Sequence, residues 1–128
     1  MERVTGIGGV FFKSIDPAAL LAWYRDHLGI EPAFDSGTVF RWPSGTNDDA
    51  SGSTTWAIFP ADSDYFGPPP SPLMVNYRVR DLDAMLAQLR AAGAEVDDRV
   101  EEIEFGRFGW AVDPDGNRFE LWEPSEGL

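Results

Sequence analysis

The sequence predicts an α+β fold in which two tandem β-α-β-β-β modules form one curved mixed sheet around a cleft. Three observations lead to this prediction: a repeat at an offset of 65 residues, a helix with start and stop signals in each half, and a proline-rich break between the halves. We therefore expect a single domain over residues 1–128. Module 1 spans 4–60, module 2 spans 73–124, and residues 61–72 link them.

Each module begins with an apolar strand that leads through an aspartate into a helix. The repeat aligns Asp16 with Asp81, and both can accept hydrogen bonds from the free backbone amides of a helix N-terminus. Apolar residues follow at helical spacing. Gly29 and Gly93 come after the two helical patterns, where a left-handed residue ends a helix.

The residues after each helix predict three strands. In module 1 we expect strands at 31–35, 38–42 and 54–59, with a loop rich in Gly, Ser, Asn and Asp at 44–53. In module 2 we expect strands at 95–100, with an extension to residue 105 left open, and at 108–113 and 118–123.

Composition and charge restrict the function. The hydrophobic share of 43%, with five Trp and nine Phe, indicates a globular protein. Cysteine is absent, which excludes disulfides and thiolate chemistry. The net charge of −12 opposes binding to nucleic acids and anionic lipids. No apolar run is long enough for a secretory signal or a membrane span, so we expect a cytoplasmic protein with neither nucleic acid nor membrane as a partner.

The last predicted strand carries a carboxylate between apolar neighbours. Residues 113–116, Asp-Pro-Asp-Gly, are typical of a tight turn. In the strand that follows, Phe119 and Leu121 point to one face, while Glu120 and Trp122 point to the other. The first face is expected to be core, and the second to face something polar.

These motifs together resemble the vicinal oxygen chelate superfamily, which includes glyoxalases, bleomycin-resistance proteins and extradiol dioxygenases. The resemblance rests on residues 23–29 at the end of the first helix, 79–83 and 92–94 at the ends of the second, and 113–123. It implies two modules side by side, a cleft that holds a small ligand or a divalent metal, and a homodimer.

The resemblance also implies where a metal would bind. Metal-dependent members draw ligands from four strand positions, which fall here on Gly9, Ala57, Met74 and Glu120. Glycine and alanine offer no donor, and a thioether is a poor partner for the metals of this superfamily. The single histidine, His27, is interpreted as stabilising the end of the first helix. We therefore expect no metal cofactor.

Strand alternation places aromatic and polar side chains on the cleft face. The candidate ligand-binding residues are Phe11, Met74, Asn76, Arg78 and Trp122, with three tryptophans whose facing is less defined, Trp42, Trp56 and Trp110. A concave surface with aromatic walls and few polar groups is typical of a small-molecule site. Glu120 is the candidate catalytic residue, although a structural ion pair with Arg78 or Arg118 explains it equally well.

Three functions remain open. The first is a metal-free, bleomycin-resistance-like protein that binds a small aromatic or cationic molecule, which the acidic charge and the tryptophans favour. The second is a lyase, isomerase or dioxygenase-type enzyme that uses Glu120 as general acid or base. The third is an accessory dimeric interaction protein whose aromatic residues form an interface.

Overall fold

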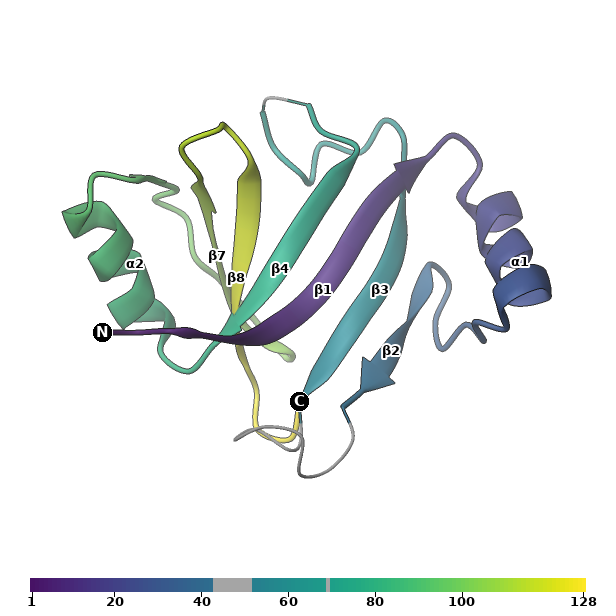
Figure 1. The fold of residues 1–128 in the computed structure, drawn as a ribbon, viewed down its shortest axis with the longest axis horizontal. Coiled ribbons are helices and arrows are strands. Elements are labelled where there is room, and N and C mark those ends of the chain that lie inside the picture. The colour runs from purple at the N-terminus through teal and green to yellow at the C-terminus, as the bar shows by residue number, and fades with distance from the viewer. Residues whose placement is uncertain (43–51, 69) are drawn as a thin grey trace.

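A single curved sheet with one helix near each end forms the scaffold of the protein (Figure 1). The computed structural model describes residues 1–42, 52–68 and 70–128, so most of the loop expected at 44–53 lies outside the described residues. The strand order in the described part is β2-β3-β1-β4-β8-β7-β5, and β6 pairs with β7.

The elements form two β-α-β-β-β-like modules. Module 1 contains β1 (Val4–Ser14), α1 (Pro17–Leu28), β2 (Gly37–Arg41) and β3 (Ser53–Pro60). Module 2 contains β4 (Leu73–Val79), α2 (Leu82–Ala91), β5 (Glu95–Val96), β6 (Glu101–Ile103), β7 (Gly106–Val112) and β8 (Arg118–Pro124). Neither helix is long and apolar enough to cross a lipid bilayer, and this holds for all the residues that the structure describes.

Two strand predictions were wrong. Residues 31–35 form only an isolated bridge between Phe34 and Gly37, because the amides of Ala33 and Phe34 both donate to the Gly37 carbonyl in a tight turn. Pro32, which has no amide proton to donate, also disfavours a strand there. The strand expected from residue 95 is divided into the short β5 and β6, since regular pairing with β7 stops after the Asp97 amide donates to the Trp110 carbonyl at 2.9 Å.

The register of the central strands confirms the repeat. β1 and β4 are antiparallel, with Phe11 opposite Met74. Each of these strands also pairs in parallel with the last strand of its own module, Phe11 with Ala57 and Asn76 with Glu120. Since Phe11 and Asn76 are equivalent at the offset of 65 residues, Ala57 and Glu120 occupy equivalent positions in the two modules.

The predicted helix caps are confirmed. The Asp16 carboxylate accepts the amide of Ala19 at 3.1 Å, and the Asp81 carboxylate accepts the amide of Ala84 at 3.0 Å. Gly29 has a φ of 70°, which closes α1 in the left-handed conformation. The sequence signals for helix ends therefore act locally, as expected.

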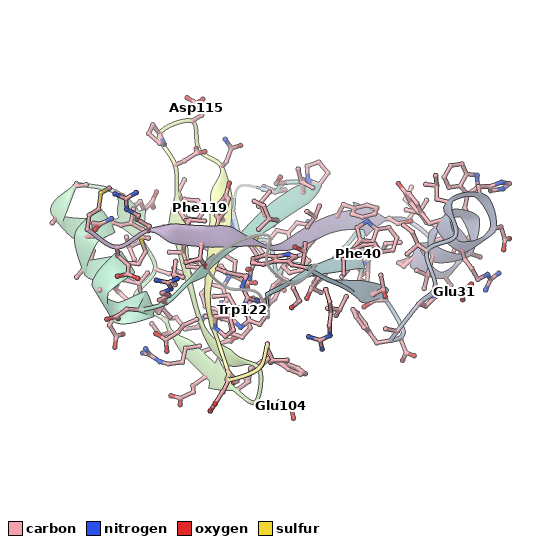
Figure 2. The ribbon with its side chains drawn as sticks, turned by 60° about the horizontal axis from the view of Figure 1, so that its bottom comes forward. Glu31, Phe40, Glu104, Asp115, Phe119 and Trp122 are labelled. Carbon is pink, nitrogen blue, oxygen red and sulfur yellow. The ribbon has the colours of Figure 1, made fainter. Side chains whose placement is uncertain are left out.

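The turn between β7 and β8 is built around Asp113. Its carboxylate accepts the amides of Asp115 and Asn117, each at 2.9 Å. Hydrogen bonds from Asn117, first of all from its side chain, hold the pKa of Asp113 below its usual value. Figure 2 shows Asp115 at the tip of this turn, so the turn projects away from the sheet.

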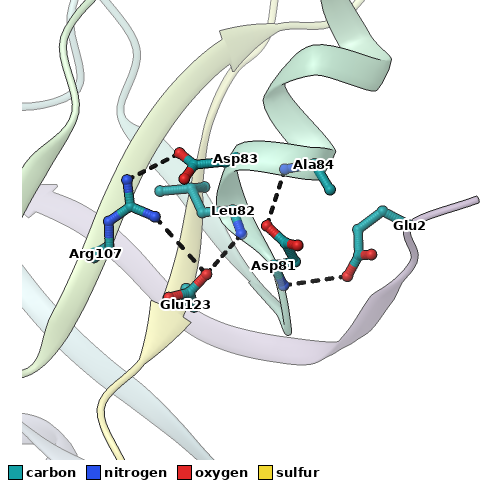
Figure 3. Close-up of polar contacts among 7 residues, drawn as sticks. All are labelled: Glu2, Asp81, Leu82, Asp83, Ala84, Arg107 and Glu123. Atoms are coloured by element: carbon teal, nitrogen blue, oxygen red, sulfur yellow. Dashed lines mark hydrogen bonds and ion pairs between the residues drawn. The ribbon is translucent and has the colours of Figure 1, made fainter.

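The start of α2 is tied to the last strand. The carboxylate of Glu123 in β8 accepts the amide of Leu82 at 2.8 Å, and Arg107 in β7 pairs with Asp83 at 2.9 Å (Figure 3). Arg107 also lies 3.9 Å from Glu123. A carboxylate at a helix N-terminus is favourable because the free amides there carry partial positive charge. These contacts hold α2 against β7 and β8.

The two faces of the sheet carry separate apolar clusters. The cluster under α2 consists of Val79, Leu82, Met85, Leu86 and Leu121, with Tyr77 and Phe119 packed against it. The cluster on the concave face consists of Phe11, Ala57, Phe66, Met74 and Trp110. The predicted alternation of β4 and β8 is therefore confirmed, because their residues divide between these faces.

Candidate functional site

Glu120 lies at the centre of the concave face and is 1% exposed. Its Oε1 accepts a hydrogen bond from Asn76 Nδ2 at 2.7 Å. Its Oε2 accepts two more, from the Tyr65 hydroxyl at 2.5 Å and from Trp110 Nε1 at 2.9 Å. Each of these donors belongs to an uncharged side chain, so the buried carboxylate is satisfied by hydrogen bonds rather than by an ion pair.

Strand pairing explains two of these donors. Asn76 in β4 and Trp110 in β7 lie directly opposite Glu120 on the two neighbours of β8. Opposite residues share a face of the sheet, so their side chains meet. Tyr65 comes instead from the linker between the modules, and the alternation of side chains along a strand cannot predict its position.

The environment raises the pKa of both Glu120 and Tyr65. Burial raises the pKa of Glu120, and the hydrogen bonds from Tyr65, Asn76 and Trp110 oppose this rise. Burial also raises the pKa of Tyr65, and the negative charge of Glu120 adds to the effect. Tyr65 therefore remains a protonated donor at neutral pH, and Glu120 holds its proton more tightly than an exposed glutamate.

The linker fills the middle of the predicted cleft. Phe66 is 1% exposed and belongs to the same cluster as Phe11, Met74 and Trp110. The Tyr65 ring stacks on Phe59 with centroids 5.5 Å apart. Residues that were expected only to connect the modules thus contribute two aromatic side chains to the concave face. Phe11, Met74 and Asn76 are buried beneath or beside them.

Arg78 lies between two aromatic rings. Its guanidinium carbon is 5.1 Å from the Trp42 ring centroid and 5.0 Å from that of Trp122. Nη1 donates to the backbone oxygen of Leu128 at 2.9 Å. Trp122 is stacked in turn on Phe108, with centroids 5.9 Å apart. The three predicted residues Arg78, Trp42 and Trp122 are therefore brought together, but as one packed stack.

The ion pair that the sequence left open for Glu120 does not form among the described residues. Arg118 Nη2 pairs with Asp97 at 2.6 Å. The Arg78 guanidinium lies between the tryptophan rings, and the carboxylate of Glu120 accepts hydrogen bonds from uncharged side chains instead. Arg78 thus makes cation–π contacts and Arg118 pairs with Asp97, so of the two interpretations that the sequence left open for Glu120 the cross-strand ion pair is not formed.

Trp56 is not part of this face, contrary to the prediction. Its ring lies 5.0 Å from that of Tyr24 in α1 and 5.5 Å from that of Phe12. Because Ala57 points to the concave face, alternation turns the neighbouring Trp56 toward the helix. Trp56 is a packing residue beneath α1.

A pocket of about 870 Å³ opens beside Tyr65, between the linker, the β5–β6 segment and the β7–β8 hairpin. Four carboxylates and two guanidinium groups line it: Asp64, Glu95, Asp97, Glu101, Arg99 and Arg118. Both arginines approach the Trp110 ring, with guanidinium carbons 4.5 Å (Arg99) and 5.8 Å (Arg118) from its centroid. Tyr65 separates this pocket from Glu120.

Sequence reasoning missed Tyr65 and Arg99. Both lie outside the regular strands, where alternation carries no information. One signal was present for the linker: two adjacent aromatic residues, Tyr65 and Phe66, in a segment otherwise rich in proline and polar residues. Large apolar side chains in such a segment indicate that part of it is buried.

The four positions for metal ligands do not fit a divalent ion. A Cβ added at Gly9 would lie only 2.7 Å from the nearest atoms of the Phe11 ring, so a larger side chain there would require this ring to move. Ala57 and Met74 provide no suitable donor, and both oxygens of Glu120 accept hydrogen bonds. The described residues contain no cluster of three His, Asp or Glu placed to hold a metal. His27 is exposed at the end of α1, with its ring 5.0 Å from Trp23.

This architecture matches a known protein family and several solved structures. The family model of the glyoxalase-like domain matches residues 9–122. A comparison with curated protein sequences finds no significant match.

Three solved structures illustrate the shared fold. Methylmalonyl-CoA epimerase from Mycobacterium tuberculosis has a TM-score of 0.63 and 22% identity, covering 95% of this chain and 89% of that chain. A variant of the Streptomyces coelicolor epimerase in complex with 2-nitronate-propionyl-CoA has a TM-score of 0.68 and 20% identity, with 93% and 96% covered. An NAD-dependent benzaldehyde dehydrogenase from Legionella pneumophila has a TM-score of 0.57 and 18% identity, with 89% and 96% covered. At these identities the likeness concerns the fold alone.

Proposed function

The chain belongs to the glyoxalase-like domain family, and from that premise we propose that it binds a small organic molecule, without a metal, in the pocket beside Tyr65. The fold is shared with epimerases of which one has been solved with an acyl-CoA ligand, so a small ligand suits this architecture. The identity of the ligand is set by the pocket of this chain and not by the fold.

One observation carries the proposal. Glu120 is the only carboxylate among the four positions that would hold a metal, and three hydrogen bonds already occupy it. The open space lies on the other side of Tyr65, where the pocket has both aromatic and charged groups around it. Its volume of about 870 Å³ falls in the range of small-molecule sites, roughly 300–1,000 Å³.

An enzyme that uses Glu120 is the second candidate. Its raised pKa is a property that a general acid needs, and Tyr65 connects it to the pocket. A substrate would have to displace the Tyr65 hydroxyl before it could reach the carboxylate. We favour binding over catalysis because Glu120 in this arrangement holds the linker in place.

The first test is calorimetric titration of the protein with small aromatic amines, amides and acids, before and after treatment with EDTA. We expect binding of at least one of these classes, with an affinity that EDTA leaves unchanged. In the variant Val112→Trp, which narrows the pocket, binding should be lost. In the matched control Val4→Trp, at an exposed position on β1 that does not line the pocket, binding should remain.

Two results would count against the proposal. One is binding that requires a stoichiometric metal ion, and the other is binding that Val112→Trp leaves intact. Turnover of a bound compound that Glu120→Gln abolishes without weakening binding would favour the enzyme instead.

A further inference from the structure

Arg99, which lines the pocket, covers the face of the buried aromatic ring of Trp110. Its guanidinium carbon is 4.5 Å from the Trp110 ring centroid, and Trp110 is 0% exposed. Arg99 lies in the segment between β5 and β6, and its side chain is 57% exposed. An exposed side chain therefore shields this ring from the pocket.

The contacts of Arg99 are weaker than those of the second arginine. Arg99 Nη1 pairs with Glu101 at 3.6 Å, and both side chains are largely exposed to solvent, where ion pairs contribute little. Arg118 is 13% exposed and pairs with Asp97 at 2.6 Å. It also packs closely on Gly67, where an added Cβ would lie 2.4 Å from Arg118 Nε. These contacts hold Arg118 in place, whereas little free energy is needed to move Arg99 away from the Trp110 ring.

The charges around the pocket favour a positive occupant. With Arg99 displaced, one guanidinium group would face four carboxylates, those of Asp64, Glu95, Asp97 and Glu101. The exposed ring of Trp110 would then offer its negative face to a cation. The Glu101 carboxylate, freed from Arg99, would lie beside the same position.

We propose that Arg99 covers the Trp110 ring while the pocket is empty and that an organic cation, such as an amidinium or a guanidinium, binds by displacing the Arg99 side chain from this ring. This inference rests on the proposed function, because it names the charge class of the ligand for the same pocket. Arg99 is then a specificity-determining residue. A neutral or anionic molecule cannot replace its contact with the ring, and a cation must compete with it.

The test uses three matched probes, benzamidinium, benzamide and benzoate, which differ chiefly in charge. Calorimetry would give their affinities for the unchanged protein and for Arg99→Ala, Arg99→Lys and Arg25→Ala. Arg25→Ala is the charge control, since Arg25 is an exposed residue of α1 paired with Asp26 and changes the net charge equally. The indole N–H signal of Trp110 in nitrogen–proton NMR spectra would report whether each probe reaches the ring.

We expect Arg99→Ala to bind benzamidinium about fivefold more tightly than the unchanged protein, since a competing cation–π contact is removed. Arg99→Lys and Arg25→Ala should stay within about twofold of it. Benzoate should bind more weakly than benzamide throughout. The Trp110 signal should shift with benzamidinium.

Two results would overturn the inference while leaving the proposed function intact. In one, benzamide and benzoate bind in the pocket at least as well as benzamidinium. In the other, Arg99→Ala weakens or does not change benzamidinium binding, or abolishes benzoate binding, which would make Arg99 an anion-binding group. If no probe binds any of these proteins and no compound of the wider titration binds either, the proposed function fails together with the inference.

Discussion

Glu120 is a buried carboxylate whose surroundings contain one unused acceptor. Asn76 donates to it through Nδ2, while Asn76 Oδ1 has no hydrogen-bond partner among the described residues. If the amide of Asn76 turned over, Oδ1 would face position 120 and could accept a hydrogen bond from a protonated carboxyl or from an amide. The site is therefore suited to a neutral group as well as to a carboxylate.

The loss of unfolding free energy on replacing Glu120 should therefore depend on whether the new side chain can accept hydrogen bonds. Glu120→Gln keeps an oxygen for Tyr65 and Trp110 and can pair with a turned Asn76, so we expect a loss of less than about 1 kcal/mol in unfolding free energy. Glu120→Leu leaves the three donors unpaired and should cost about 3 kcal/mol or more. Urea denaturation of both variants would measure the difference. Equal losses would show that the hydrogen bonds do not matter.

The pH dependence of the Glu120→Gln variant follows from the raised pKa. The folded protein binds the Glu120 proton more tightly than the unfolded chain does. Stability from this group is thus complete below the ordinary glutamate pKa of about 4.3 and is lost as the pH rises through the higher folded value. Melting temperatures of Glu120→Gln should therefore rise relative to the unchanged protein as the pH increases above about 4.3. Glu102→Gln, at an exposed position, serves as control. If the melting temperatures of Glu120→Gln and of the unchanged protein varied with pH in the same way, this expectation would be contradicted.

At the scale of elements, the two helices are attached to the sheet differently. α2 buries Leu82, Met85 and Leu86, whereas α1 has no buried residue. Both helices begin with an aspartate cap, so the difference does not come from their ends. It comes from packing, because α1 is held mainly through aromatic contacts such as that of Tyr24 with Trp56.

We therefore expect the amides of α1 to exchange with solvent faster than those of α2. Local opening needs less free energy where fewer apolar side chains are buried. α1 has 12 residues and α2 has 10, so helix length alone would favour the opposite order. Hydrogen exchange followed by mass spectrometry would measure both helices in one sample. Equal protection would mean that another contact holds α1.

At the scale of the whole molecule, module 1 presents an apolar edge. β2 is the last strand at one side of the sheet, and Figure 2 shows Phe40 on it. Val39 and Phe40 are 37% and 47% exposed. Phe34, just before β2, is 40% exposed. Exposed edge strands with apolar side chains favour pairing with another chain.

We predict that the chain forms a homodimer through this edge. Sedimentation analysis should give about twice the chain mass of 14.2 kDa. Phe40→Glu should convert the dimer to a monomer, while Ile103→Glu, at an equally exposed position on β6, should leave it unchanged. A monomer at micromolar concentration, or a dimer that withstands Phe40→Glu, would place any interface elsewhere.

Much of the fold follows from local patterns. A few neighbouring residues are enough to predict the helix caps at Asp16 and Asp81, the turn at Asp113 and the alternation of β8. The structure confirms each of these predictions. The equivalence of the two modules could also be predicted, since it needs only the offset of the repeat. The prediction at residues 31–35 was wrong because a short segment that contains a proline is compatible with a turn as well as with a strand. The facing of Trp56, which the sequence left less defined, was decided only by the contact of its ring with Tyr24 in α1.

The sequence by itself determined the two-module architecture and showed that, of the four positions at which the family resemblance implies metal ligands, only Glu120 carries a carboxylate. Only the tertiary structure decided that Tyr65 and Phe66 enter the concave face and that Arg99 lies on Trp110. The physical reason is that alternation and capping act between neighbours in the chain. The position of an irregular segment depends instead on the shape and polarity of the surface it covers, and that surface exists only after both modules have folded together.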